Sequence, residues 1–239
     1  MVALVGTVCV LGFVQSLFGV GLLLFGTPFL LLLGMPYDRV LVYLLPCSIT
    51  VSVLQVATSG GLTFEPIRRQ FLLITAPAVL AATVVALRFG SPHQIRAIVG
   101  GMLLVTALSR LGRLQAALSR AVCKHRRPLM FGLGIVHGLS NLGGGILTVI
   151  VGSSFDDKVS IRRHIAFAYG TMATIQLAVV LITKHPYVDV RTWLLLPVIA
   201  GATYLLVGQH AFRRARPRAY EWGLTGLIAS FGVILVSVT

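Results

Sequence analysis

The chain has 239 residues, of which 56% are hydrophobic and only 11% are charged. A soluble domain of this length needs far more charged surface, so the composition excludes an ordinary globular protein and indicates that most of the chain faces lipid or other apolar helices. Twenty Lys and Arg against six Asp and Glu give a net charge of +14. These cations lie between long apolar runs, where they mark cytoplasmic loops and meet anionic lipid headgroups, so we expect no nucleic-acid partner.

About eight apolar runs follow one another along the chain. The shorter ones reach the roughly 20 residues that a membrane-spanning helix needs once flanking small residues are included. The first run has neither a basic start nor a small-residue cleavage site, so we expect it to be retained. The sequence therefore predicts an all-α integral membrane protein of the plasma (inner) membrane. The runs cover residues 1–34, 40–56, 71–87, 95–108, 129–151, 165–182, 193–207 and 222–238.

The two halves of the chain resemble each other. The segment 12–21 pairs with the segment 134–143 at an offset of 122 residues, and later matches drift to offsets of 121 and then 120. The order of the matches and the small, one-directional drift favour an internal duplication over chance. Many transporters are built in this way and hold their substrate at the interface between the repeats. The matched positions include Gln15 with His137, Gly19 with Asn141, Gly21 with Gly143, Thr50 with Thr171, Gln55 with Gln176 and Pro77 with Pro197.

The distribution of Lys and Arg predicts how the halves are oriented. If every apolar run crosses the membrane once, the cations divide ten and ten between the two faces, contrary to the positive-inside rule. If the first run of each half is instead a re-entrant hairpin, fifteen lie on one face and five on the other. A hairpin plus three transmembrane helices per half is an odd number of crossings, so the fold that we expect is two inverted repeats with both termini outside. The predicted domains are a first repeat over 1–109, a basic cytoplasmic linker over 110–127 and a second repeat over 128–239.

Glycine-rich turns stand where the tips of the hairpins are expected. Residues 128–140 and 146–154 are each too short to span a membrane, but they suit half-membrane helices. Asn141 and Gly143-Gly144-Gly145 stand between them. Irregular backbone at membrane depth is tolerated only where protein or a water-filled cavity shields it. Glycine-interrupted apolar segments at matching positions of the two halves therefore predict a transport site.

The glycines form a pattern that recurs in both halves. The second half reads Gly134-x-x-x-Gly138-x-x-Asn141-Leu142-Gly143-Gly144-Gly145, and the first half keeps Gly12, Ser16, Gly19 and Gly21 but has Leu22 and Leu23 in place of the last two glycines. This pattern, with the Thr27-Pro28 that follows it, resembles the signature of the TauE/SafE family of sulfite and organosulfonate exporters. The resemblance implies a secondary transporter that exports a small anion such as sulfite, a sulfonate or a related carboxylate. The degenerate first motif leaves a larger or less polar solute open.

Backbone N–H groups at the two tips are the expected ligands of such an anion, because no Lys or Arg lies deep in the glycine-rich segments. A helix N-terminus has unpaired N–H groups and a positive dipole end, and glycine lets a ligand approach closely. The alternative is that the glycines serve only tight helix packing. The candidate substrate-binding residues are Gln15, Gly19, Gly21, His137, Asn141, Gly143, Gly144 and Gly145.

Gln15 and His137 occupy the same position of the repeat, four residues before the turn. We place His137 well inside the bilayer, where ionisable side chains are costly and often functional, and histidine titrates near physiological pH. Three roles stay open for His137: contact with the substrate, transfer of a coupling proton, and a neutral imidazole bonded to a backbone carbonyl.

Two threonines and two glutamines lie on the first full span after each hairpin and are candidates for lining the cavity. For the threonines we favour hydrogen bonds to their own helix. An unpaired glutamine is costly in lipid, so we expect both glutamines to point inward. These residues are Thr50, Gln55, Thr171 and Gln176.

An enzymatic function finds little support in the sequence. The six acidic residues fall in loops or at the ends of segments, and no metalloprotease, serine-hydrolase or phosphate-loop motif occurs. The histidines and the three cysteines show no metal-binding spacing. We expect no catalytic residue, metal or cofactor, and the expected partners are a small anionic solute and the lipid bilayer, with a homo-oligomer left open. The alternatives are a non-catalytic membrane scaffold or assembly subunit, and, less compatible with inverted hairpin repeats, a passive channel.

Overall fold

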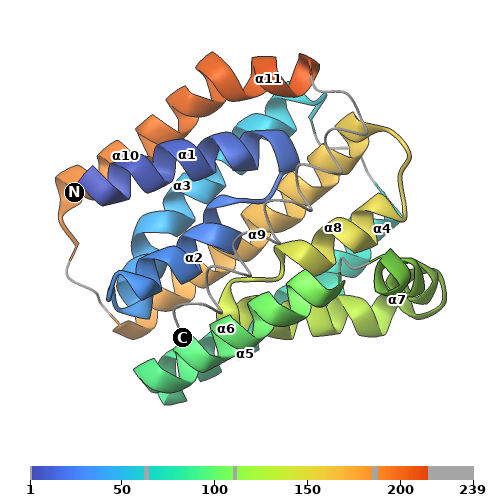
Figure 1. Cartoon of the computed structure of the whole chain (residues 1–239), viewed down its shortest axis with the longest axis horizontal. Helices are drawn as coiled ribbons and strands as arrows, with labels where there is room; N and C mark the ends of the chain where they lie inside the picture. Colours follow the sequence, from blue (N-terminus) through green and yellow to red (C-terminus); the bar gives the residue numbers. More distant parts are fainter. Residues whose placement is uncertain (1, 62–64, 110–111, 185–187, 215–239) are drawn as a thin grey trace.

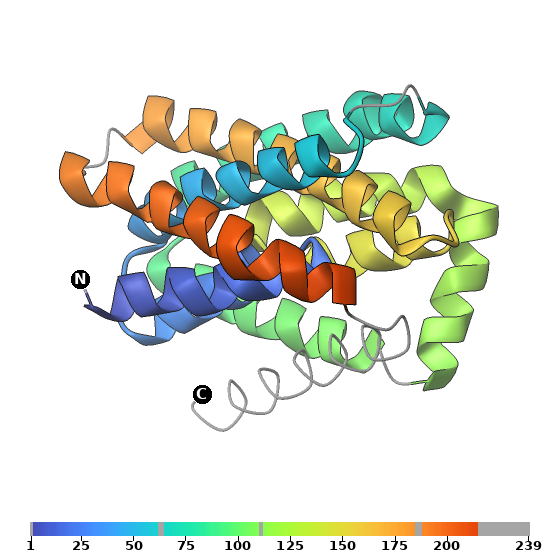
Figure 2. The same ribbon diagram turned by 90° about the horizontal axis from the view of Figure 1, so that it is seen from above.

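The computed structural model describes residues 2–61, 65–109, 112–184 and 188–214. Within these ranges every regular element is a helix and no strand occurs, which confirms the predicted all-α class (Figure 1, Figure 2). The eighth apolar run, 222–238, lies outside the described residues. In chain order the elements are α1 (Val2–Phe18), α2 (Leu22–Leu32), α3 (Tyr37–Thr58), α4 (Pro66–Gln70), the π-helix η1 (Phe71–Thr75), α5 (Ala76–Phe89), α6 (Pro92–Ser109), α7 (Gly112–Ser140), α8 (Gly144–Gly152), α9 (Lys158–Lys184), α10 (Val190–Thr203), the π-helix η2 (Tyr204–Gly208) and α11 (Gln209–Arg214).

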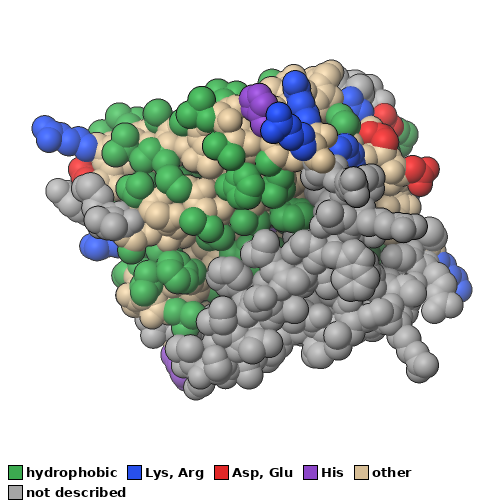
Figure 3. Space-filling view, turned by 45° about the horizontal axis from the view of Figure 1, so that its top comes forward, with side chains coloured by type: hydrophobic (Ala, Val, Ile, Leu, Met, Phe, Trp, Pro, Cys, Tyr) green, Lys and Arg blue, Asp and Glu red, His purple; other side chains and the backbone are tan. Residues whose placement is uncertain are grey.

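Four helical runs are long and apolar enough to cross a membrane, and α1 and α2 are apolar but shorter. Large apolar side chains are exposed on these runs, among them Leu73 (66%), Ile182 (71%) and Leu206 (74%). Figure 3 shows hydrophobic side chains gathered over the middle of one face, with charged side chains near its margins. Apolar surface of this extent is stable in lipid, and the chain is therefore a multi-pass membrane protein. The four runs are Tyr37–Thr58, Pro66–Phe89, Lys158–Lys184 and Val190–Arg214.

Helices α3 and α9 pack against each other at the centre of the bundle and run antiparallel (Figure 1, Figure 2). At one end the Arg162 guanidinium, near the start of α9, donates to the Ser59 hydroxyl just beyond α3, at 3.1 Å. At the other end the Trp193 indole, beyond α9, donates to the Val42 carbonyl near the start of α3, at 3.2 Å. Because α3 and α9 hold matching places in the two halves, the halves direct their first long helices in opposite senses.

Each half packs against the hairpin of the other half. Helix α10 packs against α1 and α3 of the first half, whereas α5 packs against α7 and α9 of the second half. This exchange buries each helical hairpin, α1–α2 and α7–α8, between helices that come from both halves. The burial is general: Val8, Leu23 and Leu44 of the first half have no exposed surface, and Leu142 at the second tip has none.

Small residues bring the crossed helices together. A Cβ atom added at Gly134 of α7 would lie 2.6 Å from the Ala78 Cβ of α5, and one added at Gly138 would lie 2.6 Å from the Ala82 Cβ. Small residues four positions apart allow helix backbones to approach closely in a membrane. The first two glycines of the second motif are therefore packing positions, as the packing alternative requires for them.

Most of the basic linker is helical, which corrects the expectation of a loop over 110–127. Helix α7 begins at Gly112, and its helical geometry breaks at His125 (φ −130°, ψ 41°), three residues before Pro128. Proline has no N–H group and its ring collides with the carbonyl four residues earlier, here that of Lys124, so the helix bends at this place. The bend lies beside the predicted boundary at residue 128, where the second hairpin begins.

The described cations are unevenly divided between the two ends of the bundle. One end, where α3 ends and α9 begins, is tied together by basic side chains: the Lys158 ammonium donates to the Phe212 carbonyl at 3.3 Å, and the Arg68 guanidinium lies 5.0 Å from the centre of the Phe167 ring. We call this end of the bundle the basic end. It carries Arg68, Arg69, Lys124, Arg126, Arg127, Lys158, Arg162, Arg163, Arg213 and Arg214, whereas Arg39, Arg88, Lys184 and Arg191 lie at the opposite end.

Candidate functional site

The two hairpin tips have the same local backbone. In each, three residues without helix separate the two arms, 19–21 in the first half and 141–143 in the second. The first of them is left-handed in both cases, Gly19 with φ 75° and Asn141 with φ 66°. Their N–H groups donate to the carbonyls of Gln15 (2.8 Å) and His137 (2.7 Å), respectively. Asparagine adopts left-handed geometry more readily than other residues with a Cβ, so Asn141 can stand where the first half has glycine.

The two tips touch each other inside the bundle. A Cβ atom added at Gly144 would lie 3.2 Å from Cγ1 of Val20, the middle residue of the first tip. The Asn141 amide donates to the Thr27 hydroxyl of α2 at 2.8 Å. The chain thus brings together the two predicted halves of the site, about 120 residues apart in sequence. All eight candidate substrate-binding residues are buried, so the tips are closed to the surface in this structure.

Side-chain hydrogen bonds pair the Gln15 amide of the first tip. The buried Gln15 amide donates to the hydroxyls of Ser48 (3.1 Å) and Ser52 (3.2 Å) on α3, and the Ser48 hydroxyl is placed to donate back to the Gln15 Oε1 atom at 3.2 Å. A buried amide that is fully paired stabilises the fold and has little capacity left for a ligand. Gln15 therefore holds α1 against α3.

The second tip lacks these partners. At the offset of 121, Ser48 corresponds to Tyr169 and Ser52 to Ala173. The His137 ring instead meets the Tyr169 ring edge to face, with 5.6 Å between ring centres. Among the described residues, neither ring nitrogen of His137 makes a hydrogen bond of ordinary geometry, although the Gln176 side chain lies close enough to interact with the ring. The bond to a backbone carbonyl, which the purely structural role of His137 requires, is thus not found within the described part of the chain.

Further polar atoms around His137 are also buried without a partner in the described ranges. They are the Tyr169 hydroxyl, which lies near the Leu24 backbone without making a hydrogen bond of ordinary geometry, the Asn141 Oδ1 atom and the Gln176 Oε1 atom. Burying such groups unpaired costs about 1–3 kcal/mol each. A cluster of them in one place indicates a polar ligand or ordered water. We call His137, Asn141, Tyr169 and Gln176 the polar cluster of the second tip.

The two glutamines of the long spans make equivalent hydrogen bonds, one at each tip. The Gln55 Nε2 atom donates to the Gln15 carbonyl at 2.8 Å, and the Gln176 Nε2 atom donates to the His137 carbonyl at 3.2 Å. These two carbonyls already accept the N–H groups of Gly19 and Asn141, and each glutamine adds a second hydrogen bond near the end of a helix, where carbonyls at membrane depth need protein donors. The expectation that both glutamines point inward is confirmed, and the contact that they make caps the first arm of each hairpin.

The threonines on the same spans bond to their own helices, as expected. Thr50 donates to the Pro46 carbonyl at 3.0 Å and Thr171 to the Phe167 carbonyl at 2.8 Å. Their hydroxyl protons are thereby occupied, which makes them weaker candidates for lining a polar cavity than the glutamines.

The tip glycines permit contacts that a side chain would prevent. A Cβ atom at Gly21 would lie 2.7 Å from the Gln15 backbone nitrogen, and one at Gly143 would lie 2.7 Å from the His137 Cβ atom. Helices α2 and α8 begin directly after these glycines, and within the described ranges no side chain caps either N-terminus. Gly144 and Gly145, the first two residues of α8, therefore present backbone N–H groups at the second tip without a side-chain cap.

Two residues of this region escaped the sequence reasoning. Tyr169 stands two residues before the predicted Thr171, and its correspondence with Ser48 is the signal that could have found it. Arg162, one of the fifteen cations that the sequence places on the cytoplasmic face, is buried: its guanidinium donates to the Ser16 carbonyl at 3.4 Å and lies 3.6 Å from the centre of the Phe212 ring. A cation at the end of α1 is favourable because the helix dipole is negative there.

A multi-pass membrane protein with two buried, interrupted hairpins belongs to the class of membrane transporters that such broken helices typify. The family model described as sulfite exporter TauE/SafE matches residues 4–235, almost the whole chain. The chain belongs to this family, which confirms the resemblance drawn from its glycine pattern. No curated protein and no solved structure matches the chain.

Proposed function

We propose that the protein is a secondary transporter that exports a small anion, sulfite, a sulfonate or a related carboxylate, and binds it between the two hairpin tips. Membership of the TauE/SafE family supports transport of a sulfite-like or sulfonate solute. The observation that supports this location of the anion-binding site is the polar cluster of the second tip. Its atoms without hydrogen-bond partners among the described residues lie beside the start of α8, which has no side-chain cap.

The hydrogen-bond donors of the polar cluster suit an oxyanion, whereas its two amide oxygens, on Asn141 and Gln176, suit a protonated group or a bridging water. The Tyr169 hydroxyl and the N–H group of a neutral His137 ring are hydrogen-bond donors, and the first N–H groups of α8 add a positive dipole end. Sulfite, sulfonate and carboxylate groups each present two or three oxygens that accept such bonds. The binding is by directed dipoles, which avoids placing a permanent cation at membrane depth.

The proposed mechanism rests on two inverted repeats, each a re-entrant hairpin followed by three transmembrane helices. The antiparallel direction of α3 and α9 and the exchange of α5 and α10 between the halves support a two-fold relation in the membrane plane. Movement of the two halves against each other around the tips would open the site to either side in turn. The basic end is then cytoplasmic, with the linker, and both termini lie outside.

The scaffold alternative has one observation in its favour, the tight packing at Gly134 and Gly138. That packing lies along α7 and requires no polar atoms. It does not account for the polar cluster, which a protein selected only for helix packing would replace with apolar residues. We therefore keep transport as the function.

A matched pair of hydroxyl deletions tests the binding site. Tyr169→Phe removes a donor from the polar cluster, and we expect sulfite flux in proteoliposomes to fall roughly 10- to 100-fold, as for the loss of a hydrogen bond to a charged group. Ser48→Ala is the control at the corresponding position of the first tip, and its flux should stay within about threefold of the unchanged protein, since its bond goes to Gln15. Equal fluxes in Tyr169→Phe and the unchanged protein would move the site away from the second tip.

The orientation has a separate test. A single cysteine replacing Arg191, at the end opposite the basic end, should react with a membrane-impermeant maleimide in intact cells. A cysteine replacing Arg214, at the basic end, should react only after the membrane is permeabilised. The reverse pattern would show that the basic end faces outward and would refute the predicted topology.

A further inference from the structure

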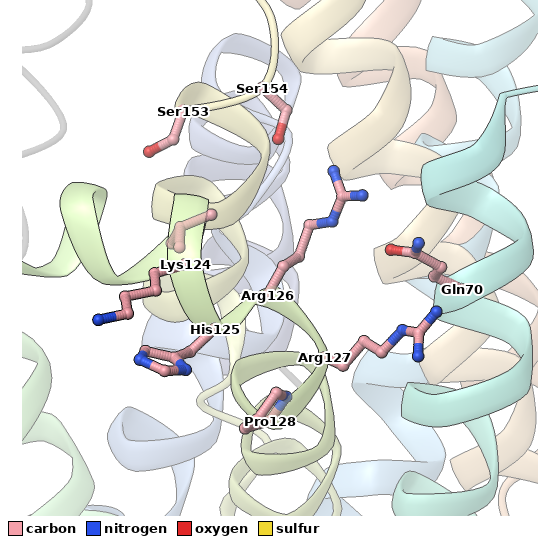
Figure 4. Close-up of a pocket in the computed structure, with 9 residues that line it drawn as sticks. Gln70, Lys124, His125, Arg126, Arg127, Pro128, Ser153 and Ser154 are labelled. Atoms are coloured by element: carbon pink, nitrogen blue, oxygen red, sulfur yellow. The ribbon is translucent and has the colours of Figure 1, made fainter.

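A polar cavity lies at the basic end, away from the hairpin tips. It has a volume of about 580 Å³ and is lined where the bend of α7 meets the ends of α8 and α4. Its lining includes Lys124, His125, Arg126 and Arg127 of α7, Gln70 of α4, and Ser154 just beyond α8. Figure 4 shows Arg126 and Arg127 extending on the side of Gln70, with Ser154 above, while Lys124 and His125 point to the other side of the bent helix.

The bend of α7 creates this arrangement. In a straight helix, residues 126 and 127 would continue the periodicity of the linker, but the break at His125 and the proline at 128 redirect the chain there. Two adjacent arginines are thereby held at the mouth of a cavity, where their like charges repel each other.

No carboxylate balances these charges within the cavity, since none of its described lining residues is acidic. The closest acidic residues along the chain, Asp156 and Asp157, follow Ser154. The Asp157 carboxylate accepts the N–H groups of Val159 (3.1 Å) and Ser160 (2.8 Å) at the start of α9. The Asp157 carboxylate therefore stabilises the start of α9, and within the described lining of the cavity the two arginines face no acidic side chain. Guanidinium groups bind phosphate oxygens in pairs and do so better than ammonium groups.

Apolar side chains are exposed one turn deeper on the same two helices. Phe131 follows Arg127 on α7 and is 55% exposed, and Leu73 follows Gln70 and is 66% exposed. Polar residues followed by exposed apolar residues mark the boundary between headgroups and acyl chains. The cavity therefore lies where a lipid can place its phosphate beside the arginines and its chains along the apolar surface.

We propose that this cavity binds the phosphate group of an anionic phospholipid, with Arg126 and Arg127 as the principal ligands and Gln70 as an additional donor. Basic pockets between membrane helices on the cytoplasmic side are suited to such headgroups. Because the bend of α7 leads directly into the second hairpin, a bound lipid also fixes the base of the arm that carries His137. This inference is independent of the substrate that the tips bind.

The experiment measures lipid binding to the purified full-length protein by native mass spectrometry, with phosphatidylglycerol and phosphatidylcholine as the two probes. In Arg126→Gln/Arg127→Gln we expect phosphatidylglycerol to bind roughly 10- to 30-fold more weakly, from about 1 kcal/mol per lost cation. The matched control is Arg213→Gln/Arg214→Gln, which removes two exposed cations of the same end outside the cavity and should leave binding unchanged. Arg126→Lys/Arg127→Lys, which keeps the charge and should keep the fold, should lose a smaller share of the binding.

Three results would overturn the proposal. Equal weakening in the two glutamine variants would show a general effect of charge rather than a site. Unchanged binding in Arg126→Gln/Arg127→Gln would show that the lipid binds elsewhere, provided that the variant elutes as a folded protein. Displacement of phosphatidylglycerol by an equal concentration of inorganic phosphate would show a site for free anions rather than for lipid.

Discussion

The first and second hairpin tips have the same backbone conformation but differ in the hydrogen bonds that their side chains make. Both have a left-handed residue after the first arm, both have a glutamine from a long span on a carbonyl of that arm, and both end at a helix without a side-chain cap. In the first tip the Gln15 amide is paired with Ser48 and Ser52, whereas in the second the His137 ring faces Tyr169 and Ala173 has no hydroxyl to offer.

This difference shows how the two copies of a duplicated unit can take different roles, one in stabilising the fold and the other in binding a ligand. The hydrogen bonds that stabilise a tip and the polar atoms that bind a ligand compete for the same buried space. In the first tip the Gln15 amide is paired within the protein, and only the Gln55 Oε1 atom, like that of Gln176, has no partner among the described residues. The second has His137 and Tyr169 atoms without hydrogen-bonded partners in the described part of the chain, and these are the atoms that we propose bind the anion. The comparison makes four predictions, given from the largest expected effect to the smallest.

Gly144→Val should abolish anion transport. Its Cβ would lie 3.2 Å from Val20 and 3.4 Å from the Tyr169 ring, and a branched side chain adds two further carbons to a place where the tips touch. Flux in proteoliposomes is the measurement, with expression and elution volume to check folding. Gly132→Val on the neighbouring α7 is the control, because a Cβ atom there meets nothing within 4 Å. A well-expressed Gly144→Val protein with full flux would show that the tips do not bind the anion.

His137→Gln separates the roles that stay open for the histidine. Glutamine donates and accepts hydrogen bonds but does not titrate, so a role in binding should leave flux within about tenfold of the unchanged protein, with the response to a pH gradient intact. Loss of accumulation against a gradient while exchange survives would instead assign the coupling proton to His137. Flux and pH response both unchanged, with stability lower by about 1–3 kcal/mol, would reduce His137 to a structural residue. We expect binding, because no carboxylate among the described residues stands beside the ring to relay a proton.

Gln15→Leu should act in the opposite way, on stability rather than on transport. It leaves the Ser48 and Ser52 hydroxyls without the amide that pairs them, and we expect the free energy of unfolding to fall by about 1–3 kcal/mol. Flux per folded molecule should stay within about threefold. The measurement is thermal unfolding in detergent alongside flux. A large loss of flux without a loss of stability would contradict the division between the two tips and would place Gln15 in the binding site.

Asn141→Gly makes the second tip more like the first and should have the smallest effect. Glycine accepts the left-handed backbone without strain, so the cost is limited to the hydrogen bond with Thr27, about 0.5–1.5 kcal/mol. Asn141→Ala loses the same bond and should be less stable than Asn141→Gly by roughly another 1 kcal/mol, because alanine is strained at positive φ. Thermal unfolding of the two variants measures the difference. An Asn141→Ala protein more stable than Asn141→Gly would show that the left-handed turn is not retained.

Local chemistry allowed much of this protein to be predicted from its sequence. The apolar runs indicated a multi-pass all-α membrane protein, because burial of backbone polar groups in lipid leaves few alternatives to the helix. The glycine pattern located both turns and indicated the family. The inward position of Gln55 and Gln176 and the self-bonded state of Thr50 and Thr171 followed from the cost of an unpaired amide and the reach of a hydroxyl.

Only the tertiary structure decided which residues of the motif pack and which turn, and which polar atoms are left without partners. Gly134, Gly138 and Gly144 meet Ala78, Ala82 and Val20, which come from the other half of the chain, whereas Gly143 meets His137 of its own half. The pairing of Gln15 with Ser48 crosses 33 residues, and Tyr169 joins the tip from 32 residues beyond His137. Such contacts depend on how helices that are far apart in the sequence cross each other. The residue pattern within one segment does not indicate which other segment will pack against it. The bend of α7 lies between these cases: Pro128 predicts a bend locally, but the partners that turn the bend into a basic cavity, Gln70 and Ser154, are supplied by the fold.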